Sequence, residues 1–158
     1  MWSLLLEFIG YLLLLIGFAL FPEIMGKIFS DRKYHGKGEE LACRALREIA
    51  GCDVKCNIRP NFLRNPETGK NLELDCFTPR NQTAIEYDGI QHFEYPNPFH
   101  RSKKEFEKQV QRDKIKDKLC ESNGINLIRV PYTVDKNKKG EKRYSAIKNY
   151  IWERIKFF

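Results

Sequence analysis

The beginning of the sequence has almost no charge. Between Trp2 and Phe21 the only charged residue is Glu7, and no basic residue precedes this apolar run. About 20 apolar residues are enough to span the roughly 30 Å hydrocarbon core of a bilayer, and the run lacks the polar face of a soluble amphipathic helix. The missing basic N-terminal region argues against a cleaved signal peptide. We therefore expect a transmembrane helix at residues 2–21, with a signal peptide and a buried apolar helix as alternatives.

Basic residues appear only after this segment, at Lys27, Arg32, Lys33 and Lys37. Positive charge flanking a membrane helix marks its cytoplasmic side. The sequence thus predicts a single-pass membrane protein whose C-terminal domain lies on the cytoplasmic side. We expect an anchor over residues 1–26, a linker over 27–38 and one domain over 39–158.

The cysteines lack the spacing of a metal or disulfide framework. There are five of them, an odd number, and no C-x-x-C pair occurs. Neither a zinc ribbon nor a complete set of disulfides is therefore indicated. Cys52 and Cys56 could bind a metal, but no second pair follows. Free, buried thiols in a reducing compartment are therefore expected.

Acidic residues are outnumbered, with 21 Asp and Glu against 28 Lys and Arg, a net charge of +7. Such a balance suits nucleic acid or an anionic membrane surface, although it also serves simple solubility. No internal repeat is present.

The rest of the chain alternates between helical and extended patterns. Leu41, Ala42, Ala45, Leu46 and Ile49 form one apolar stripe, which predicts a helix over 39–50 that Gly51 ends. We expect an irregular stretch over 52–70, strands over 71–78, 83–90 and 126–132, a helix from its cap at Ser102 to about 122, and a last helix carrying Tyr144, Ile147 and Ile151. This order predicts a small α/β domain with a mixed sheet flanked by helices.

Acidic residues alternate along the first two predicted strands. If Thr78 pairs with Thr83 across a four-residue turn, Asp75 falls opposite Glu86, and Glu73 falls opposite Asp88. Like charges so placed repel each other, and a divalent cation such as Mg²⁺ would offset the repulsion. The alternative is a solvated hairpin, but the apolar residues on both of its faces favour an enclosed site.

Four features together carry a resemblance to a known family: LELDCF, EYDGIQH at 86–92, Gln109, Arg112, Asp113 and Lys116 as Q-x-x-R-D-x-x-K, and Gly124-Ile125 before NLIRVPY. The resemblance is to the PD-(D/E)XK, or restriction-endonuclease-like, superfamily. It covers roughly residues 36–132 and is nearest to very-short-patch-repair-like and homing-type nuclease domains, including those of large DNA viruses. It implies a restriction-endonuclease-like fold and a Mg²⁺- or Mn²⁺-dependent nuclease that acts on DNA as an endonuclease.

Carried over residue by residue, Asp75 and Glu86 match the metal-binding carboxylates of that superfamily. A further glutamate from the preceding helix corresponds to Glu39 or Glu40. Glu39 is preferred because it lies at the margin of the apolar stripe, whereas Glu40 points nearly opposite.

One position departs from the pattern, because Asp88 stands where the superfamily has a lysine. Asp88 could be a further ligand or a general base, Gln91 or His92 could position the water, or a lysine could come from the face of the later helix that carries Lys116 and Cys120. We favour the first two together. His92 could also be an ordinary packing residue beside Phe93.

Basic residues after the acidic hairpin are candidates for gripping a nucleic-acid backbone. They are Arg101, Lys103, Lys104, Lys116, Lys136, Lys138 and Lys139. A solvated charged surface is the alternative. Two other functions stay open: a catalytically inactive nuclease fold that binds nucleic acid or protein, which the Asp88 departure favours, and a structural membrane protein.

Overall fold

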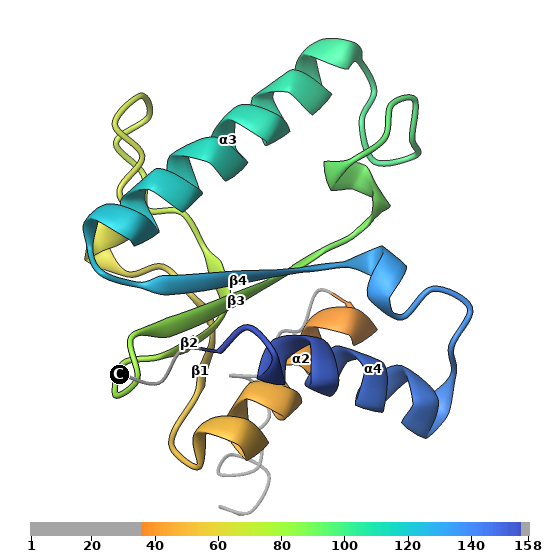
Figure 1. Cartoon of the computed structure of the whole chain (residues 1–158). Coiled ribbons are helices and arrows are strands. Elements are labelled where there is room, and N and C mark those ends of the chain that lie inside the picture. Colours follow the sequence, from red (N-terminus) through yellow and green to blue (C-terminus); the bar gives the residue numbers. More distant parts are fainter. Residues whose placement is uncertain (1–35, 156–158) are drawn as a thin grey trace, which may run out of the picture. The chain divides into compact units, whose positions relative to one another are not determined.

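The computed structural model describes residues 36–155, and every structural statement below refers to them. Helices and strands follow one another along the chain as shown in Figure 1. They are α2 (Lys37–Ala50), β1 (Lys55–Ile58), η1 (Asn61–Leu63), β2 (Leu74–Thr78), β3 (Thr83–Asp88), η2 (Ile90–His92), α3 (Lys103–Ser122), β4 (Asn126–Pro131), η3 (Tyr132–Val134) and α4 (Gly140–Trp152). The α/β class is therefore confirmed for the described part of the chain.

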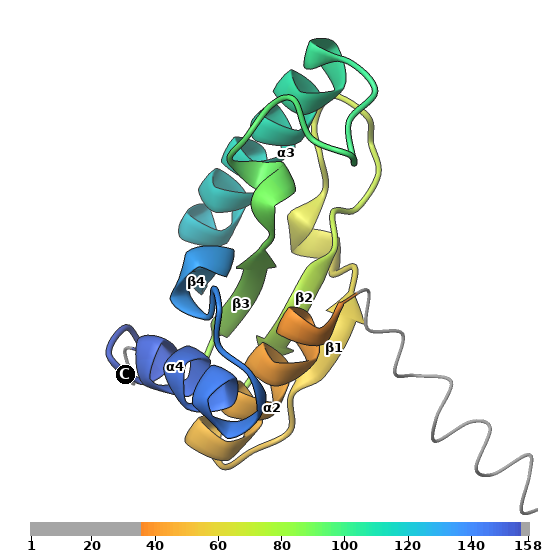
Figure 2. The same ribbon diagram turned by 90° about the vertical axis from the view of Figure 1, so that its right-hand side faces the viewer.

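The strands form a mixed sheet in the order β1-β2-β3-β4. β1, β2 and β3 are antiparallel neighbours, as the opposed arrows of Figure 2 show, whereas β3 and β4 are parallel. Two parallel neighbours need a crossover, and the chain makes it through η2 and α3. The predicted mixed sheet is confirmed.

Helices cover both faces of the sheet. One buried cluster joins α2 and α4 to the sheet through residues such as Leu46, Ile85 and Ile147. A second cluster, with Phe77, Ala84 and Cys120, lies on the α3 side. Figure 1 shows α3 on one side of the strands and the α2–α4 pair on the other. The site described below lies on the α3 side, where Glu86 of β3 meets α3.

Both predicted helix boundaries around α3 are confirmed. The Ser102 hydroxyl accepts a hydrogen bond from the Glu105 backbone N–H at 3.3 Å, as an N-cap residue does. At the other end Gly124 has φ of 68° and the Ile125 N–H donates to the Cys120 carbonyl. These two signals fix the length of α3 and so the position of its side chains over the sheet.

The hairpin has the predicted register, with Thr78 opposite Thr83 and Cys76 opposite Ile85. The alternation of a regular strand fails at Leu74, which in an unbroken strand would share a face with Cys76. Leu74 packs on the α3 side and Cys76 packs on the α2 side. The regular pleat is broken between them, since the β2–β3 pairing ends at Cys76 and Asn57 of β1 has a left-handed φ of 50°.

Strand β1 lies within the stretch that we expected to be irregular. Its sequence KCNI is partly exposed throughout and shows no apolar alternation. Only its pairing with β2 makes it a strand, and such long-range pairing is invisible in local sequence.

A disulfide joins Cys43 of α2 to Cys76 of β2, while Cys52, Cys56 and Cys120 are free. The expectation of free thiols is therefore wrong for two of the cysteines. The pair is 33 residues apart in sequence and meets only because α2 packs on β2. The bond ties the helix that carries Glu39 to the strand that carries Asp75.

Reducing this disulfide should lower the free energy of unfolding by about 3 to 4 kcal/mol, because the open chain gains loop entropy when unfolded. Urea denaturation of the full chain with and without reductant measures the change. A Cys43→Ala variant should not respond to reductant. Alkylation of the unreduced, unfolded chain should label three thiols, and labelling of all five would contradict the disulfide.

No helix within residues 36–155 combines the length and apolarity needed to cross a membrane. The transmembrane helix expected at residues 2–21 lies outside the described residues.

Candidate active site

A cavity of about 440 Å³ opens between the sheet, α2 and α3. Charged and polar side chains from five elements and two loops line most of it. They include Glu39, Arg59, Glu73, Asp75, Glu86, Gln91, His92, Gln109, Arg112, Asp113 and Lys116. Such a concentration of converging polar groups is typical of a functional site.

Asp75 and Glu86 are held side by side at the end of the hairpin pairing. The Asp75 backbone N–H donates to Glu86 Oε1 at 3.2 Å, and the Tyr87 backbone N–H donates to Asp75 Oδ2 at 2.8 Å. Cys43 Sγ of the disulfide lies 3.2 Å from the Asp75 carbonyl oxygen. Each carboxylate is thus fixed by the backbone of the other strand, and the predicted proximity of the two is confirmed.

Lys116 enters the same cavity from α3. Its ammonium group donates a hydrogen bond to Glu86 Oε2, and only 12% of its side chain is exposed. One turn further along the helix, Cys120 is buried against the sheet, so this face of α3 points at β3. Lys116 therefore lies inside the site rather than on an outer surface that could grip a distant backbone.

Glu39 reaches the cavity from the first turn of α2, whereas Glu40 is exposed. The helix comes very close to β3 here, since a Cβ added to Gly38 would lie 2.3 Å from the Tyr87 ring. Glycine is required at this approach, and it lets Glu39 lie near the hairpin carboxylates.

Asp88 is engaged elsewhere and does not line the cavity. Arg129 of β4 donates to both of its oxygens, at 2.8 and 3.0 Å. Glu73 pairs with Arg59 at 3.0 Å. The expected second rung of facing acids, Glu73 with Asp88, is therefore replaced by two separate ion pairs.

Gln91 and His92 follow β3 and line the cavity from η2. His92 Nδ1 hydrogen-bonds to Asp113 Oδ2 of α3 at 2.9 Å, and Gln109 donates to Asp113 at 3.1 Å. Burial opposes protonation of His92, but Asp113 and Asp88 outweigh it and raise the pKa of the imidazole. His92 thus joins α3 to the end of β3 as part of a polar network.

The motif Q-x-x-R-D-x-x-K accounts for the cavity wall on α3. Gln109, Arg112, Asp113 and Lys116 all line it, as i, i+3, i+4 and i+7 spacing on one helix face requires. We did not expect Arg59 and Arg112 as site residues. The motif held the signal for Arg112, whereas nothing in the local sequence indicated Arg59.

The remaining predicted basic residues lie outside this cavity. Arg101, Lys103 and Lys104 are exposed at the start of α3, and Lys136, Lys138 and Lys139 are exposed before α4. The structure therefore separates Lys116 from the other basic residues with which we grouped it.

Burial disfavours charge on both hairpin carboxylates. Desolvation, together with Glu39 and Asp88, raises the pKa of Asp75 from 3.8 to about 6 against the opposing effects of the Tyr87 N–H and Lys116. Desolvation and Asp75 raise the pKa of Glu86 from 4.5 to about 7 although Lys116 and Arg129 oppose this. Two buried acids of this kind bind a proton or a cation.

The oxygen ligands suit Mg²⁺ or Mn²⁺. Within residues 36–155 no three His, Cys, Asp or Glu side chains converge as a ready-made metal site. Mg²⁺ usually binds through one or two carboxylates and fills its other positions with water and substrate phosphate. Asp75 and Glu86, with Glu39 nearby, would supply that number of oxygen donors to such an ion.

Without metal, the chain should be less stable at pH 8 than at pH 5. The folded state holds protons on Asp75 and Glu86 up to about pH 6 and 7, and the unfolded chain releases them near 3.8 and 4.5. Stability therefore falls as pH rises through this interval. Thermal unfolding should show a melting temperature lower by on the order of 10 °C at pH 8 than at pH 5.

Mg²⁺ should restore the melting temperature at pH 8 but not at pH 5, where protons occupy the carboxylates. Asp75→Asn should weaken both the fall in melting temperature between pH 5 and pH 8 and its recovery with Mg²⁺. An equal response to Mg²⁺ at the two pH values would contradict this assignment.

The fold and the cavity define an α/β domain in which two neighbouring acids of the mixed sheet meet a lysine of α3. Relatives occur in viruses. Uncharacterized protein 033L of Invertebrate iridescent virus 3 is 42% identical over 110 residues, 70% of this chain and 57% of that protein. Uncharacterized protein 307L of Invertebrate iridescent virus 6 is 38% identical over 140 residues, 80% of this chain and 66% of that protein.

Uncharacterized protein 094L of Frog virus 3 is 46% identical over 97 residues, 60% of this chain and 62% of that protein. The chain therefore spans 57 to 66% of the lengths of these relatives. No protein-family model and no solved structure matches the chain.

Proposed function

We propose that this domain is a metal-dependent nuclease with a restriction-endonuclease-like fold, which hydrolyses phosphodiester bonds of DNA. One observation carries the proposal: Glu39, Asp75, Glu86 and Lys116 come from four elements and line one cavity. The resemblance in sequence supports the same class, and DNA is preferred over RNA on that resemblance alone.

The residues present fit a hard divalent cation, because two carboxylates lie side by side, Glu86 only 4% exposed and Asp75 half-buried. Asp75 and Glu86 would hold it, with Glu39 as a further oxygen ligand. The ion would lower the pKa of a water and balance charge on the scissile phosphate.

Side chains of the protein would orient the attacking water and bind the phosphate. The Lys116 ammonium, held at Glu86, would orient the attacking water and stabilise charge that develops on the phosphate. Arg59 and Arg112 line the same cavity and would bind the remaining phosphate oxygens. In this proposal Lys116 takes the role of the lysine that the superfamily has at the position of Asp88. Asp88 cannot take that role, because it is an acid whose charge Arg129 neutralises.

The apolar segment 2–21 adds a second element to the proposal. It would hold the nuclease domain at the cytoplasmic face of a membrane and restrict it to nucleic acid brought to that surface. Fractionation of cells that express the full chain tests this, and recovery of the chain in the soluble fraction would count against it.

The direct test is a cleavage assay with the purified full chain. Supercoiled, linear duplex and single-stranded DNA and RNA are incubated with Mg²⁺, with Mn²⁺ or with EDTA. We expect cleavage of at least one DNA form with metal and none in EDTA. Lack of cleavage of every substrate, together with no Mg²⁺ or Mn²⁺ binding by calorimetry, would refute the proposal.

A further inference from the structure

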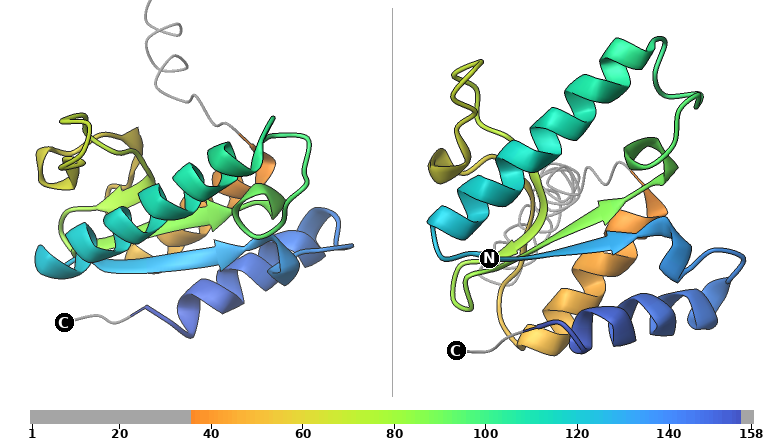
Figure 3. Two further views of the ribbon diagram at one scale, coloured as in Figure 1. Left: turned by 90° about the horizontal axis from the view of Figure 1, so that it is seen from above. Right: turned by 45° about the horizontal axis from the view of Figure 1, so that its top comes forward.

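A second hollow, of about 480 Å³, lies between α2 and the start of α4. Figure 3 shows these two helices side by side. Five basic side chains and one acidic side chain line it, namely Lys37, Arg44, Lys138, Lys139, Arg143 and Glu141. We refer to it as the basic hollow.

Three of the five basic side chains of the basic hollow form no ion pair within residues 36–155. Arg143 pairs with the buried Asp135, and Arg44 pairs with Glu48 at 3.1 Å. Lys37, Lys138 and Lys139 form no ion pair with a carboxylate of the described residues. Lys138 donates to the Val134 carbonyl at 2.9 Å, which orients the ammonium without neutralising it.

The start of α4 adds to the attraction for anions. Gly140, the first residue of α4, lines the basic hollow, and no side chain caps this end of the helix. Uncapped N–H groups at a helix start favour an anion. A ligand with several negative charges would therefore offset both the cation repulsion and the uncapped helix.

The basic hollow and the carboxylate cavity are neighbours, although no residue lines both. Lys37 lines the hollow two residues before Glu39, which lines the cavity. Tyr87 lines the cavity, and its hydroxyl accepts a 3.4 Å hydrogen bond from Arg143 of the hollow. A ligand that fills both sites must be an extended polyanion, because a single phosphate group can occupy only one.

We infer that the basic hollow binds the phosphodiester backbone of the same nucleic acid whose scissile phosphate lies in the carboxylate cavity. The inference rests on the proposed function and extends it to the flanking substrate. Its contacts would go to phosphates, so binding there would be salt-sensitive and independent of sequence.

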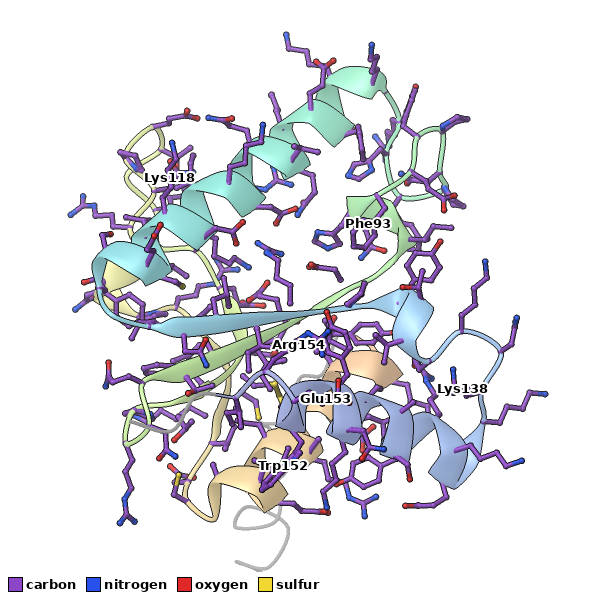
Figure 4. The ribbon with its side chains drawn as sticks, viewed as in Figure 1. Phe93, Lys118, Lys138, Trp152, Glu153 and Arg154 are labelled. Carbon is purple, nitrogen blue, oxygen red and sulfur yellow. A yellow bond between two sulfur atoms is a disulfide. The ribbon has the colours of Figure 1, made fainter. Side chains whose placement is uncertain are left out.

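The test measures binding without cleavage. Fluorescence anisotropy of a labelled DNA duplex of 20 base pairs is recorded with the full chain in EDTA, over a series of salt concentrations. Lys138→Gln/Lys139→Gln is compared with Lys114→Gln/Lys118→Gln, a matched pair on the exposed face of α3. Figure 4 shows Lys118 and Lys138 at opposite sides of the view.

We expect the Lys138/Lys139 variant to bind about tenfold more weakly, with a salt slope lower by about 2, because two phosphate contacts are lost. The α3 pair should change affinity less than threefold. Equal weakening by the two pairs would overturn the inference, because it would indicate diffuse attraction only.

Two further arms separate other sources of negative charge. Tripolyphosphate that displaces the duplex at equal phosphate concentration would overturn the inference in favour of a small-anion site. Lysine-dependent binding to phosphatidylserine vesicles, without lysine-dependent DNA binding, would overturn it in favour of a membrane surface. Because EDTA is present throughout, failure of the cleavage assay would affect only the nuclease proposal.

Discussion

Asp75→Asn and Glu86→Gln should each reduce metal-dependent cleavage by on the order of 10²–10³-fold or more. The amides keep the size of the carboxyl groups but cannot supply the negative charge that holds a divalent cation. Calorimetry should show weaker Mg²⁺ and Mn²⁺ binding in both variants. Glu40→Gln is the matched control, since it removes the same charge from an exposed position next to Glu39.

The stability of Asp75→Asn separates loss of chemistry from loss of fold. An asparagine Oδ1 can still accept from the Tyr87 N–H, which now donates to Asp75 Oδ2 at 2.8 Å. The variant also removes a buried charge beside Glu86, so its metal-free form should be at least as stable as the parent at pH 8. An Asp75→Asn chain that is folded and fully active would rule out Asp75 as a metal ligand.

Glu86→Gln should behave differently in stability, because Lys116 would lose its ionic partner inside the cavity. A buried cation without its counter-charge is costly. We therefore expect a modest loss of stability for Glu86→Gln and none for Asp75→Asn.

The sequence was sufficient to predict the proximity of Asp75 and Glu86. Alternation and a four-residue turn fix the register of the hairpin, and both are local properties of the chain. The ends of α3 were predicted correctly for the same reason, because they depend on the nearby residues Ser102 and Gly124. Each of these predictions needed only residues within a few positions of one another.

Features that depend on packing between distant segments could not be predicted from the sequence. The parallel register places Arg129 beside Glu86, and Arg129, 41 residues from Asp88, neutralises Asp88. Cys43 and Cys76 form a disulfide only because α2 crosses β2. Strand β1 exists only through its pairing with β2.

The placement of Arg129 also weakens the case for an inactive module. That alternative rested on Asp88 standing where the superfamily has lysine. Asp88 is now accounted for as the partner of Arg129, and a lysine reaches Glu86 from α3 instead. The two acids and a lysine therefore meet in space, although the lysine comes from a different position in the sequence.

Lys116→Met should therefore reduce the maximal cleavage rate by on the order of 10²-fold or more while metal binding is retained. Methionine fills similar space without the ammonium group, and loss of that cation removes one of the charges that favour ionisation of Glu86 and lower its pKa. The pH profile of cleavage should shift upward as a result. Lys114→Met, on the exposed face of the same helix, should leave rate and profile unchanged.

Comparison of Lys116→Met with Asp88→Asn decides which of the two residues, Lys116 or Asp88, takes the role of the superfamily lysine. Asp88→Asn should lower stability, because Arg129 loses an ionic partner. If Lys116 orients the water, a folded sample of this variant should still keep most of its cleavage rate at saturating metal. Lys116→Arg should recover part of the rate, since it restores the charge with a different shape. A folded Asp88→Asn variant without activity, beside an active Lys116→Met variant, would reverse the assignment and return the water-activating role to β3.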